Sequence, residues 1–91
     1  MELREIVLVV SMNCLYSKAL LRYLRAKYSN LLDRVKFIVV DDPSGAEEAK
    51  KLGVDFTPTL IVDGRITVVG FEPDKIKDTF ELLRRDLEEG D

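Results

Sequence analysis

The sequence predicts one α/β domain, residues 1–91, in which a four-stranded mixed sheet carries helices on both faces. Three observations predict this class. A purely apolar, β-branched run lies near the start of the chain, and segments with helical spacing separate it from later strand-like runs. One of those later runs ends in an Asp-Gly pair, which is typical of a hairpin. The expected order of elements is therefore β-α-β-α-β-β-α.

The first strand is expected at Ile6–Val10, where no polar residue alternates with the apolar ones. A strand of this kind is buried on both faces, so it belongs in the middle of the sheet. Helical spacing follows from Leu15 to Tyr28. The expected apolar stripe of this helix consists of Leu15, Ala19, Tyr23 and Ala26, with Leu20 and Leu24 beside it. The opposite, solvated face carries Lys18, Arg22 and Arg25.

The second strand is expected at Val35–Val40. Because a helix separates it from the first strand, the two strands are expected to be parallel and joined by a right-handed crossover. A short helix is expected at Ala46–Leu52, with its N-cap at Asp42 or Ser44. Gly53 suits the C′ position that ends such a helix.

The third and fourth strands are expected at Thr59–Val62 and Arg65–Val69, joined by a two-residue turn at Asp63-Gly64. This antiparallel pair makes the sheet mixed. The last helix begins at Pro73, because proline suits the first helical position. Its core-facing stripe is expected to consist of Ile76, Phe80, Leu83 and Leu87. The tail at 88–91 is expected to be frayed.

Composition excludes several classes of function. The net charge of −3 lacks the basic excess of a nucleic-acid-binding protein. The longest apolar run, Ile6–Val10, is far short of the roughly 20 residues of a membrane-spanning helix, and the N-terminus does not resemble a signal peptide. We therefore expect a cytoplasmic protein with no membrane or nucleic-acid partner. The lack of Gln and Trp beside plentiful Lys, Arg and Glu favours a thermophilic source.

The chain has one cysteine and no histidine. An intramolecular disulfide, the usual zinc ligand sets and a histidine-dependent nucleophilic mechanism are therefore excluded. The cysteine, Cys14, lies between the central strand and the first helix, where helix N–H groups stabilise an anion and can lower a thiol pKa from about 8.5 into the range ~3.5–7.5. The alternative is a lone buried cysteine that packs as a small apolar residue. Its position favours the reactive thiol.

Three segments resemble the thioredoxin and glutaredoxin superfamily, in its small, glutaredoxin-sized form. Cys14-Leu15-Tyr16-Ser17 matches the family's C-x-x-C or C-x-x-S motif. Thr57-Pro58-Thr59 is similar to the stretch that carries a cis-proline before the third strand, and Val69-Gly70 matches the end of the fourth strand. The resemblance covers essentially the whole chain, and it implies a thioredoxin-like fold.

The resemblance also implies site residues: Cys14 as the nucleophile, Ser17 at the resolving position, and Tyr16, Thr57, Pro58 and Gly70 as substrate-binding residues. The backbone of Thr57 would pair with an extended substrate beside a cis Pro58 that faces Cys14. Tyr16 would wall the sulfur, and Gly70 would lie where glutaredoxins contact glutathione. The alternatives are an ordinary trans-proline at 58, a partly exposed aromatic at 16 and a strand terminator at 70.

Ser17 is the main departure from a dithiol enzyme. A hydroxyl can hydrogen-bond a thiolate, but it cannot attack a mixed disulfide, so turnover needs an external thiol such as glutathione, another small thiol or a protein. Ser17 is either the natural residue or a replacement of a native resolving cysteine, and the sequence leaves both open. Leu8 stands where thioredoxins carry a buried acid, and Ser11 where glutaredoxins often carry a lysine.

Three functions follow. The favoured one is a thiol–disulfide oxidoreductase that acts through Cys14, needs no resident cofactor or metal, and works as a monomer with disulfide-containing proteins and a reductase or external thiol. The second is a non-catalytic binding module on the same fold. The third is an iron–sulfur cluster carrier, in which two chains and two external thiolates would hold the cluster.

Overall fold

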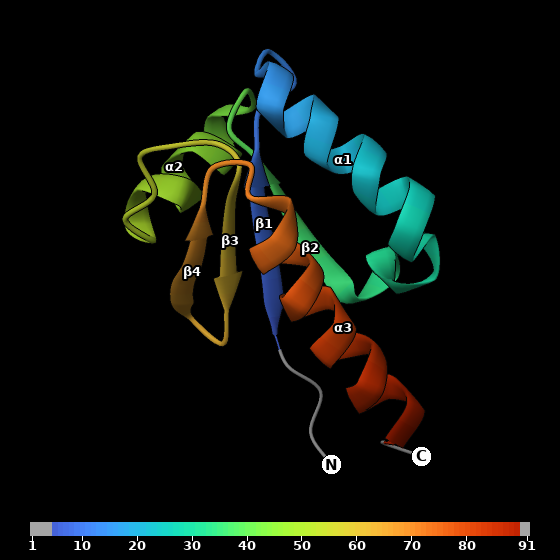
Figure 1. Cartoon of the computed structure of the whole chain (residues 1–91). Coiled ribbons are helices and arrows are strands. Elements are labelled where there is room, and N and C mark those ends of the chain that lie inside the picture. Colours follow the sequence, from blue (N-terminus) through green and yellow to red (C-terminus); the bar gives the residue numbers. More distant parts are fainter. Residues whose placement is uncertain (1–4, 90–91) are drawn as a thin grey trace.

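The computed structural model describes residues 5–89 of the chain (Figure 1). The elements, in order, are β1 (Ile6–Val10), α1 (Leu15–Tyr28), a 3₁₀ helix η1 (Ser29–Arg34), β2 (Val35–Val39), α2 (Pro43–Lys51), β3 (Thr59–Val62), β4 (Arg65–Val69) and α3 (Pro73–Glu89). The expected order of strands and α-helices is confirmed. No helix within the described part of the chain is both long and apolar enough to cross a membrane.

The four strands form one mixed sheet in the order β2-β1-β3-β4. β1 pairs parallel with β2 and antiparallel with β3, and β3 pairs antiparallel with β4. All five residues of β1 are buried, as expected for a central strand without polar alternation. The turn between β3 and β4 places Asp63 at φ 52° and Gly64 at φ 82°, which is the two-residue hairpin geometry that Asp-Gly favours.

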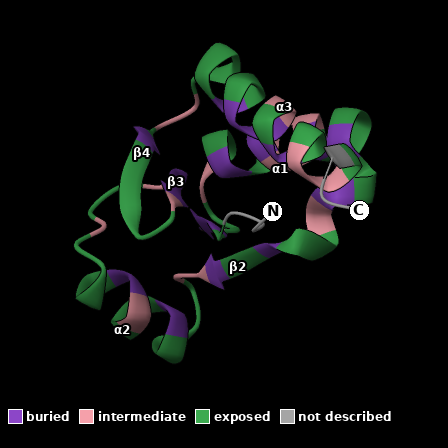
Figure 2. Ribbon diagram, turned by 90° about the horizontal axis from the view of Figure 1, so that it is seen from below, coloured by how far each residue is buried: buried purple, intermediate pink, exposed green. Residues whose placement is uncertain are grey.

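Alternate residues of β1 face two separate apolar layers. Ile6, Leu8 and Val10 belong to the larger layer, with residues of α1 and α3. Val7 and Val9 belong to a smaller layer that includes Ala49 of α2. Figure 2 shows α2 on one side of the sheet and α1 with α3 on the other. Helices therefore cover both faces of the sheet, as the sequence predicts.

The expected apolar stripe of α1 is wrong in part: Leu20 and Leu24 are buried as expected, but Leu15 and Ala26 are exposed. The buried residues of α1 are Ser17, Leu20, Leu24 and Tyr28, whereas Leu15 is 80% exposed. The first turn of α1 lies at the carboxyl end of β1, where it extends beyond the sheet (Figure 1). Leu15 and Tyr16 of this turn are therefore exposed to solvent, whereas Ser17 is buried. The stripe of the later turns still has helical spacing, but it is rotated from the predicted one. The cationic face of α1 is exposed as expected.

The helix α2 begins three residues earlier than predicted, at Pro43. Asp42 is its N-cap residue, and proline suits the first helical position that follows. Gly53 follows its end with φ 78°, which confirms the predicted C′ glycine. Within α2, Gly45 packs against β2 so closely that a Cβ built there would lie 2.0 Å from the Val39 carbonyl oxygen. Only glycine fits this contact between helix and strand.

The helix α3 confirms the predicted core stripe, since Ile76, Phe80 and Leu83 are buried. It continues to Glu89, so the expectation of a frayed tail is wrong for residues 88 and 89. Leu87 packs against the larger apolar layer, which holds the last turn of the helix in place. Residues 90 and 91 lie outside the described part of the chain.

Candidate active site

Cys14 is the N-cap residue of α1, directly after the turn that ends β1. Its backbone is extended, with φ −104° and ψ 120°, and its sulfur accepts a hydrogen bond from the Ser17 amide at 3.4 Å. The Cys14 amide donates to the Ser11 carbonyl at 3.2 Å, which closes the turn before the helix. The thiol thus occupies the place where a serine or aspartate side chain usually satisfies free helix N–H groups.

The surroundings of Cys14 lower the pKa of its thiol to about 7. The largest cause is hydrogen bonding from the Ser17 side chain, followed by the Ser17 amide and the Thr57 side chain. Partial burial opposes the shift, because it disfavours the charged form. With such a pKa, about half of the thiol is ionised at neutral pH, which provides a nucleophilic thiolate.

Ser17, whose amide donates to the sulfur, is fully buried. Its hydroxyl oxygen accepts a hydrogen bond from the Ser11 amide at 3.1 Å. The hydroxyl can therefore direct its own proton toward Cys14, since its oxygen already accepts from the backbone. The structure brings residues 14 and 17 together, as the C-x-x-S motif implies.

The loop before β3 lies on the other side of the sulfur. The Thr57–Pro58 peptide bond is cis, and the Cys14 sulfur lies 3.5 Å from the Thr57 carbonyl oxygen. Pro58 is buried, and its carbonyl accepts a hydrogen bond from the Gly70 amide at 2.7 Å. The structure therefore places Thr57, Pro58 and Gly70 in one connected region next to Cys14.

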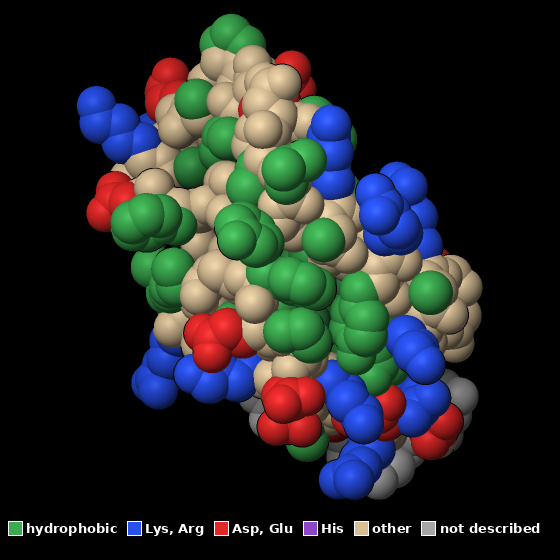
Figure 3. Space-filling view, turned by 45° about the horizontal axis from the view of Figure 1, so that its top comes forward, with side chains coloured by type: hydrophobic (Ala, Val, Ile, Leu, Met, Phe, Trp, Pro, Cys, Tyr) green, Lys and Arg blue, Asp and Glu red, His purple; other side chains and the backbone are tan. Residues whose placement is uncertain are grey.

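The fourth predicted substrate-binding residue, Tyr16, is 66% exposed. It is part of an apolar collar around the thiol, which we define as Met12, Leu15, Tyr16, Phe56 and Val69. Every member is a large hydrophobic side chain that is at least 41% exposed. Figure 3 shows hydrophobic side chains gathered across this face of the molecule. The sequence analysis missed the collar, because it assigned Leu15 to the core and gave Met12 and Phe56 no role.

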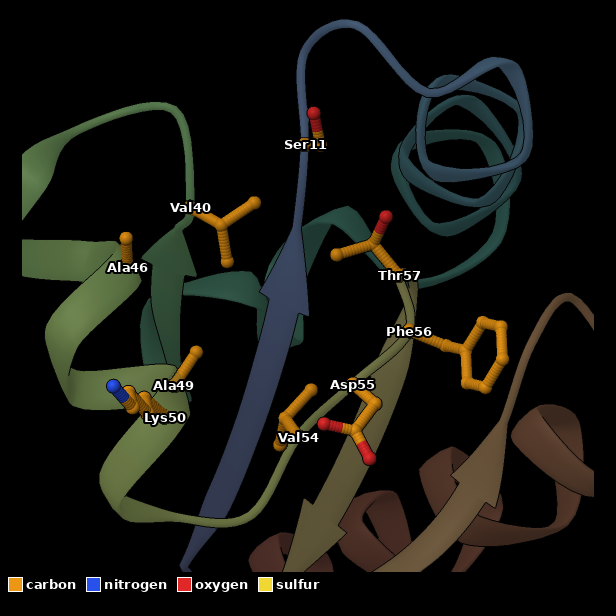
Figure 4. A pocket seen from close by; sticks show the side chains of 9 residues that line it. All are labelled: Ser11, Val40, Ala46, Ala49, Lys50, Val54, Asp55, Phe56 and Thr57. Carbon is orange, nitrogen blue, oxygen red and sulfur yellow. The ribbon is translucent and has the colours of Figure 1, made fainter.

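A cleft of about 390 Å³ lies beside the thiol, between α2 and the loop before β3 (Figure 4). Ser11 and Thr57 line its end nearest Cys14. Val40, Ala49 and Val54 supply apolar lining, and Lys50 and Asp55 supply opposite charges. The Phe56 ring points away from the cleft. The cleft can receive a partly apolar group attached to a substrate that reacts at the sulfur.

The sequence analysis also missed Asp41, which follows the carboxyl end of β2. Its carboxylate contacts the turn between β1 and Cys14 through two hydrogen bonds. The signal that could have found it is topological. The carboxyl ends of parallel neighbouring strands meet at one edge of a sheet, so a polar residue after β2 lies near the turn after β1.

A family model described as a thioredoxin domain matches residues 5–81. No curated protein sequence matches the chain. Thioredoxin f from spinach chloroplast, in its short form, has a similar structure, with 18% identity and a TM-score of 0.68 over 91% of this chain and 78% of that chain.

Two other solved structures are similar to this chain. One belongs to a study of thiol resolution in yeast mitochondrial 1-Cys peroxiredoxin via glutathione/thioredoxin systems, with 20% identity and a TM-score of 0.66 over 89% of this chain and 79% of that one. The other belongs to a complex of ferredoxin:thioredoxin reductase and thioredoxin f2, with 19% identity and a TM-score of 0.67 over 90% and 78%. These likenesses show the fold, and the family match covers most of the sequence. The chain therefore belongs to the thioredoxin-domain family.

Proposed function

We propose that the chain is a thiol–disulfide oxidoreductase in which Cys14 is the only nucleophilic thiol. The observation that carries this proposal is the setting of the Cys14 sulfur. It accepts a hydrogen bond from a helix N-terminus, its pKa is lowered to about 7, and it lies beside the Thr57 carbonyl. The helix N-terminus and the lowered pKa favour a thiolate nucleophile, and a cysteine with a purely structural role needs neither of them.

The proposed reaction proceeds in three exchanges. The Cys14 thiolate attacks one sulfur of a substrate disulfide, so a mixed disulfide forms and the other substrate sulfur leaves as a thiolate that takes up a proton. An external thiol then attacks the mixed disulfide at the Cys14 sulfur and releases the second substrate thiol. A second external thiol then attacks the disulfide that joins Cys14 to the first external thiol. This exchange restores the Cys14 thiolate and releases the two external thiols as one disulfide. Overall, one disulfide is reduced and two external thiols are oxidised.

The external thiol is needed because Ser17 occupies the resolving position, where a hydroxyl cannot cleave a disulfide. We propose a small thiol of the glutathione type or a protein thiol for this role. Cys14 is partly exposed within the apolar collar, which leaves the sulfur accessible to such a molecule. A monomeric, cytoplasmic protein of a thermophile remains our expectation, with a reductase and disulfide-containing proteins as partners.

Substrate binding in this proposal uses the loop before β3. The Thr57 backbone would pair with an extended segment next to the reacting disulfide, beside Pro58. Gly70, held against the Pro58 carbonyl, and Tyr16 would flank that segment. The collar would cover the apolar surroundings of a disulfide in a protein substrate. A small disulfide would need to reach only the Cys14 sulfur and would not depend on contacts with the collar.

A non-catalytic binding module is the second candidate, and the collar favours it. The collar gathers several large exposed hydrophobic side chains, and contiguous exposed apolar surface of this kind often marks an interaction site for another protein. Such a module would bind an apolar protein surface without any exchange at Cys14. Binding that survives Cys14→Ser, together with an unreactive thiol, would indicate this function.

The test compares thiol alkylation rates across pH for the unchanged chain, Cys14→Ser and Ser17→Cys. We expect a thiol pKa near 7, no reactivity in Cys14→Ser, and a reversible intramolecular disulfide in Ser17→Cys that speeds the reduction of model disulfides. Ser29→Cys, at the exposed far end of α1, is the matched control with a second thiol that cannot reach Cys14. A thiol pKa at the ordinary value, with slow alkylation, would contradict the proposed function.

A further inference from the structure

Both carboxylate oxygens of Asp41 hold the turn that leads to Cys14. Oδ1 accepts the Ser11 hydroxyl at 2.7 Å, and Oδ2 accepts the Met12 amide at 2.9 Å. Hydrogen bonds to an ionised carboxylate are roughly twice as strong as neutral ones. Two of them, on adjacent residues, fix both the position and the orientation of the turn.

The sheet brings Asp41 to this place. β1 and β2 run parallel, with Val10 opposite Val39, and the Val40 amide donates to the Val10 carbonyl at 3.0 Å just beyond the strands. Asp41 thus leaves the sheet next to the residues that follow β1. Its side chain needs no long reach across solvent, so the contact is a consequence of strand register.

Ser11 connects the carboxylate to the reactive thiol. Its hydroxyl donates to Asp41 and accepts the Asn13 amide at 3.1 Å, so the turn is bonded on both sides of Met12. Its amide donates to the Ser17 hydroxyl at 3.1 Å. With that oxygen occupied as an acceptor, the Ser17 proton is free to point at the Cys14 sulfur.

We propose that Asp41 is a positioning residue for Cys14, which acts by fixing Ser11 so that the Ser17 hydroxyl is directed at the sulfur. This inference deepens the proposed function and rests on it, because positioning matters only if Cys14 is the reacting thiol. It assigns a role in the site to a side chain that contacts neither the sulfur nor a substrate.

The sign of one measurement separates positioning from a simple effect of charge. A nearby negative charge disfavours a thiolate, so removal of the Asp41 charge alone would lower the Cys14 pKa. Loss of the hydrogen bonds that orient Ser17 would raise it, because the Ser17 side chain is the largest cause of the lowered pKa. The two explanations predict opposite shifts.

The experiment measures the rate of Cys14 alkylation by iodoacetamide from pH 5 to 10 in Asp41→Asn and Asp41→Ala. We expect the thiol pKa to rise by at least about half a unit in Asp41→Ala and less in Asp41→Asn, whose amide oxygen can still accept one hydrogen bond. Asp42→Asn is the matched control. It removes the same charge one residue away, from an exposed side chain that makes no capping hydrogen bond, and we expect its thiol pKa to stay at the natural value.

An unchanged or lowered pKa in Asp41→Ala, or an equal rise in Asp42→Asn, would overturn the inference. If Asp41→Ala fails to fold, the single variants Ser11→Ala and Asp41→Asn and their combination provide the test, because both changes act on the hydrogen bond between Ser11 and Asp41. Their double variant should shift the pKa no further than the larger single change, whereas full additivity would contradict a shared path. A natural chain whose own thiol pKa is ordinary would instead overturn the proposed function.

Discussion

The Cys14 sulfur caps the helix that carries it, because the Ser17 amide donates to that sulfur at 3.4 Å. One atom is thus both the candidate nucleophile and the acceptor for a free N–H group of α1. A thiolate is a better acceptor than a thiol, so ionisation of Cys14 strengthens the N-terminus of α1. Chemistry at the sulfur and stability of the helix are linked.

This link predicts how stability depends on pH. The folded-state pKa of Cys14, about 7, lies below the value of an unfolded thiol. The stabilisation is therefore fully present above the unfolded pKa of about 8.5, and it is lost as the pH falls through about 7. We expect the free energy of unfolding in urea to increase by about 1–2 kcal/mol from pH 6 to pH 9. In Cys14→Ser this increase in the free energy of unfolding should disappear. An unchanged increase in that variant would mean that other titrating groups cause it.

Substitution of Ser17 by alanine should weaken both the site and the fold. The change removes the main hydrogen bond to the thiolate, so we expect the Cys14 pKa to rise by about one unit in alkylation measurements. It also leaves the Ser11 amide without its buried acceptor, which costs about 1–3 kcal/mol of unfolding free energy. Ser29→Ala, at the exposed end of α1, is the control. If the Cys14 pKa rises as expected but the protein loses no stability, the hydrogen bond from the Ser11 amide to the Ser17 hydroxyl would be contradicted.

The apolar collar should matter for protein substrates and not for small ones. In Tyr16→Ser and Phe56→Ser, we expect kcat/KM for a protein disulfide to fall about tenfold each, since each change removes about 1–2 kcal/mol of apolar contact. The rate with a small disulfide should change less than twofold. Leu82→Ser, an exposed apolar residue of α3 away from the thiol, serves as the control. Equal losses of kcat/KM on both substrates would mean that the collar affects the reactivity of the Cys14 thiol and not the binding of protein substrates.

Gly45 should tolerate no side chain. A Cβ at this position would lie 2.0 Å from the Val39 carbonyl oxygen, and that atom belongs to a strand that cannot move alone. We expect Gly45→Ala to destabilise the protein by about 2–4 kcal/mol in urea unfolding, despite the better helix propensity of alanine. The neighbouring exposed Ser44→Ala should change stability by less than about 0.5 kcal/mol. A stable Gly45→Ala protein would show that α2 can shift away from β2.

The Tyr28 hydroxyl should control stability at high pH. It donates at 2.7 Å to the partly exposed Glu81 carboxylate, at the edge of the larger apolar layer, and burial raises the Tyr28 pKa to about 12. Because the folded pKa exceeds the unfolded value of about 10, stability is lost as the pH rises above about 10. We expect Tyr28→Phe to be less stable at pH 7 by about 1 kcal/mol, yet to lose less stability between pH 9 and 12. Tyr16→Phe, at an exposed tyrosine, is the control, and it should lose as much stability between pH 9 and 12 as the unchanged chain.

Much of the fold could be predicted from local patterns. The apolar run of β1, the Asp-Gly turn and the stripe of α3 each depend on residues close in sequence, and all three are confirmed. The stripe of α1 could not be predicted correctly. Its apolar spacing does not reveal that the first turn lies beyond the sheet, where Leu15 is exposed and Ser17 is buried.

The site was predictable only in part, for a similar reason. Cys14 and the Thr57–Pro58 segment stand out as short motifs, and the structure brings them within 3.5 Å of each other. Asp41 has no motif. Its importance comes from hydrogen bonds to residues about thirty positions away, and such contacts appear only when strand register is known.

Ser17 also has a consequence for how long a complex lasts. A dithiol enzyme cleaves its covalent adduct with its own second thiol, within the same molecule and at a high effective concentration. In the proposed single-thiol mechanism, the adduct would persist until an external thiol reacts with it, so its lifetime would be set by the surrounding thiol concentration. In a thiol-poor buffer, the chain with Ser17 should therefore hold its partners covalently, and gel electrophoresis without reductant would reveal the covalent complexes.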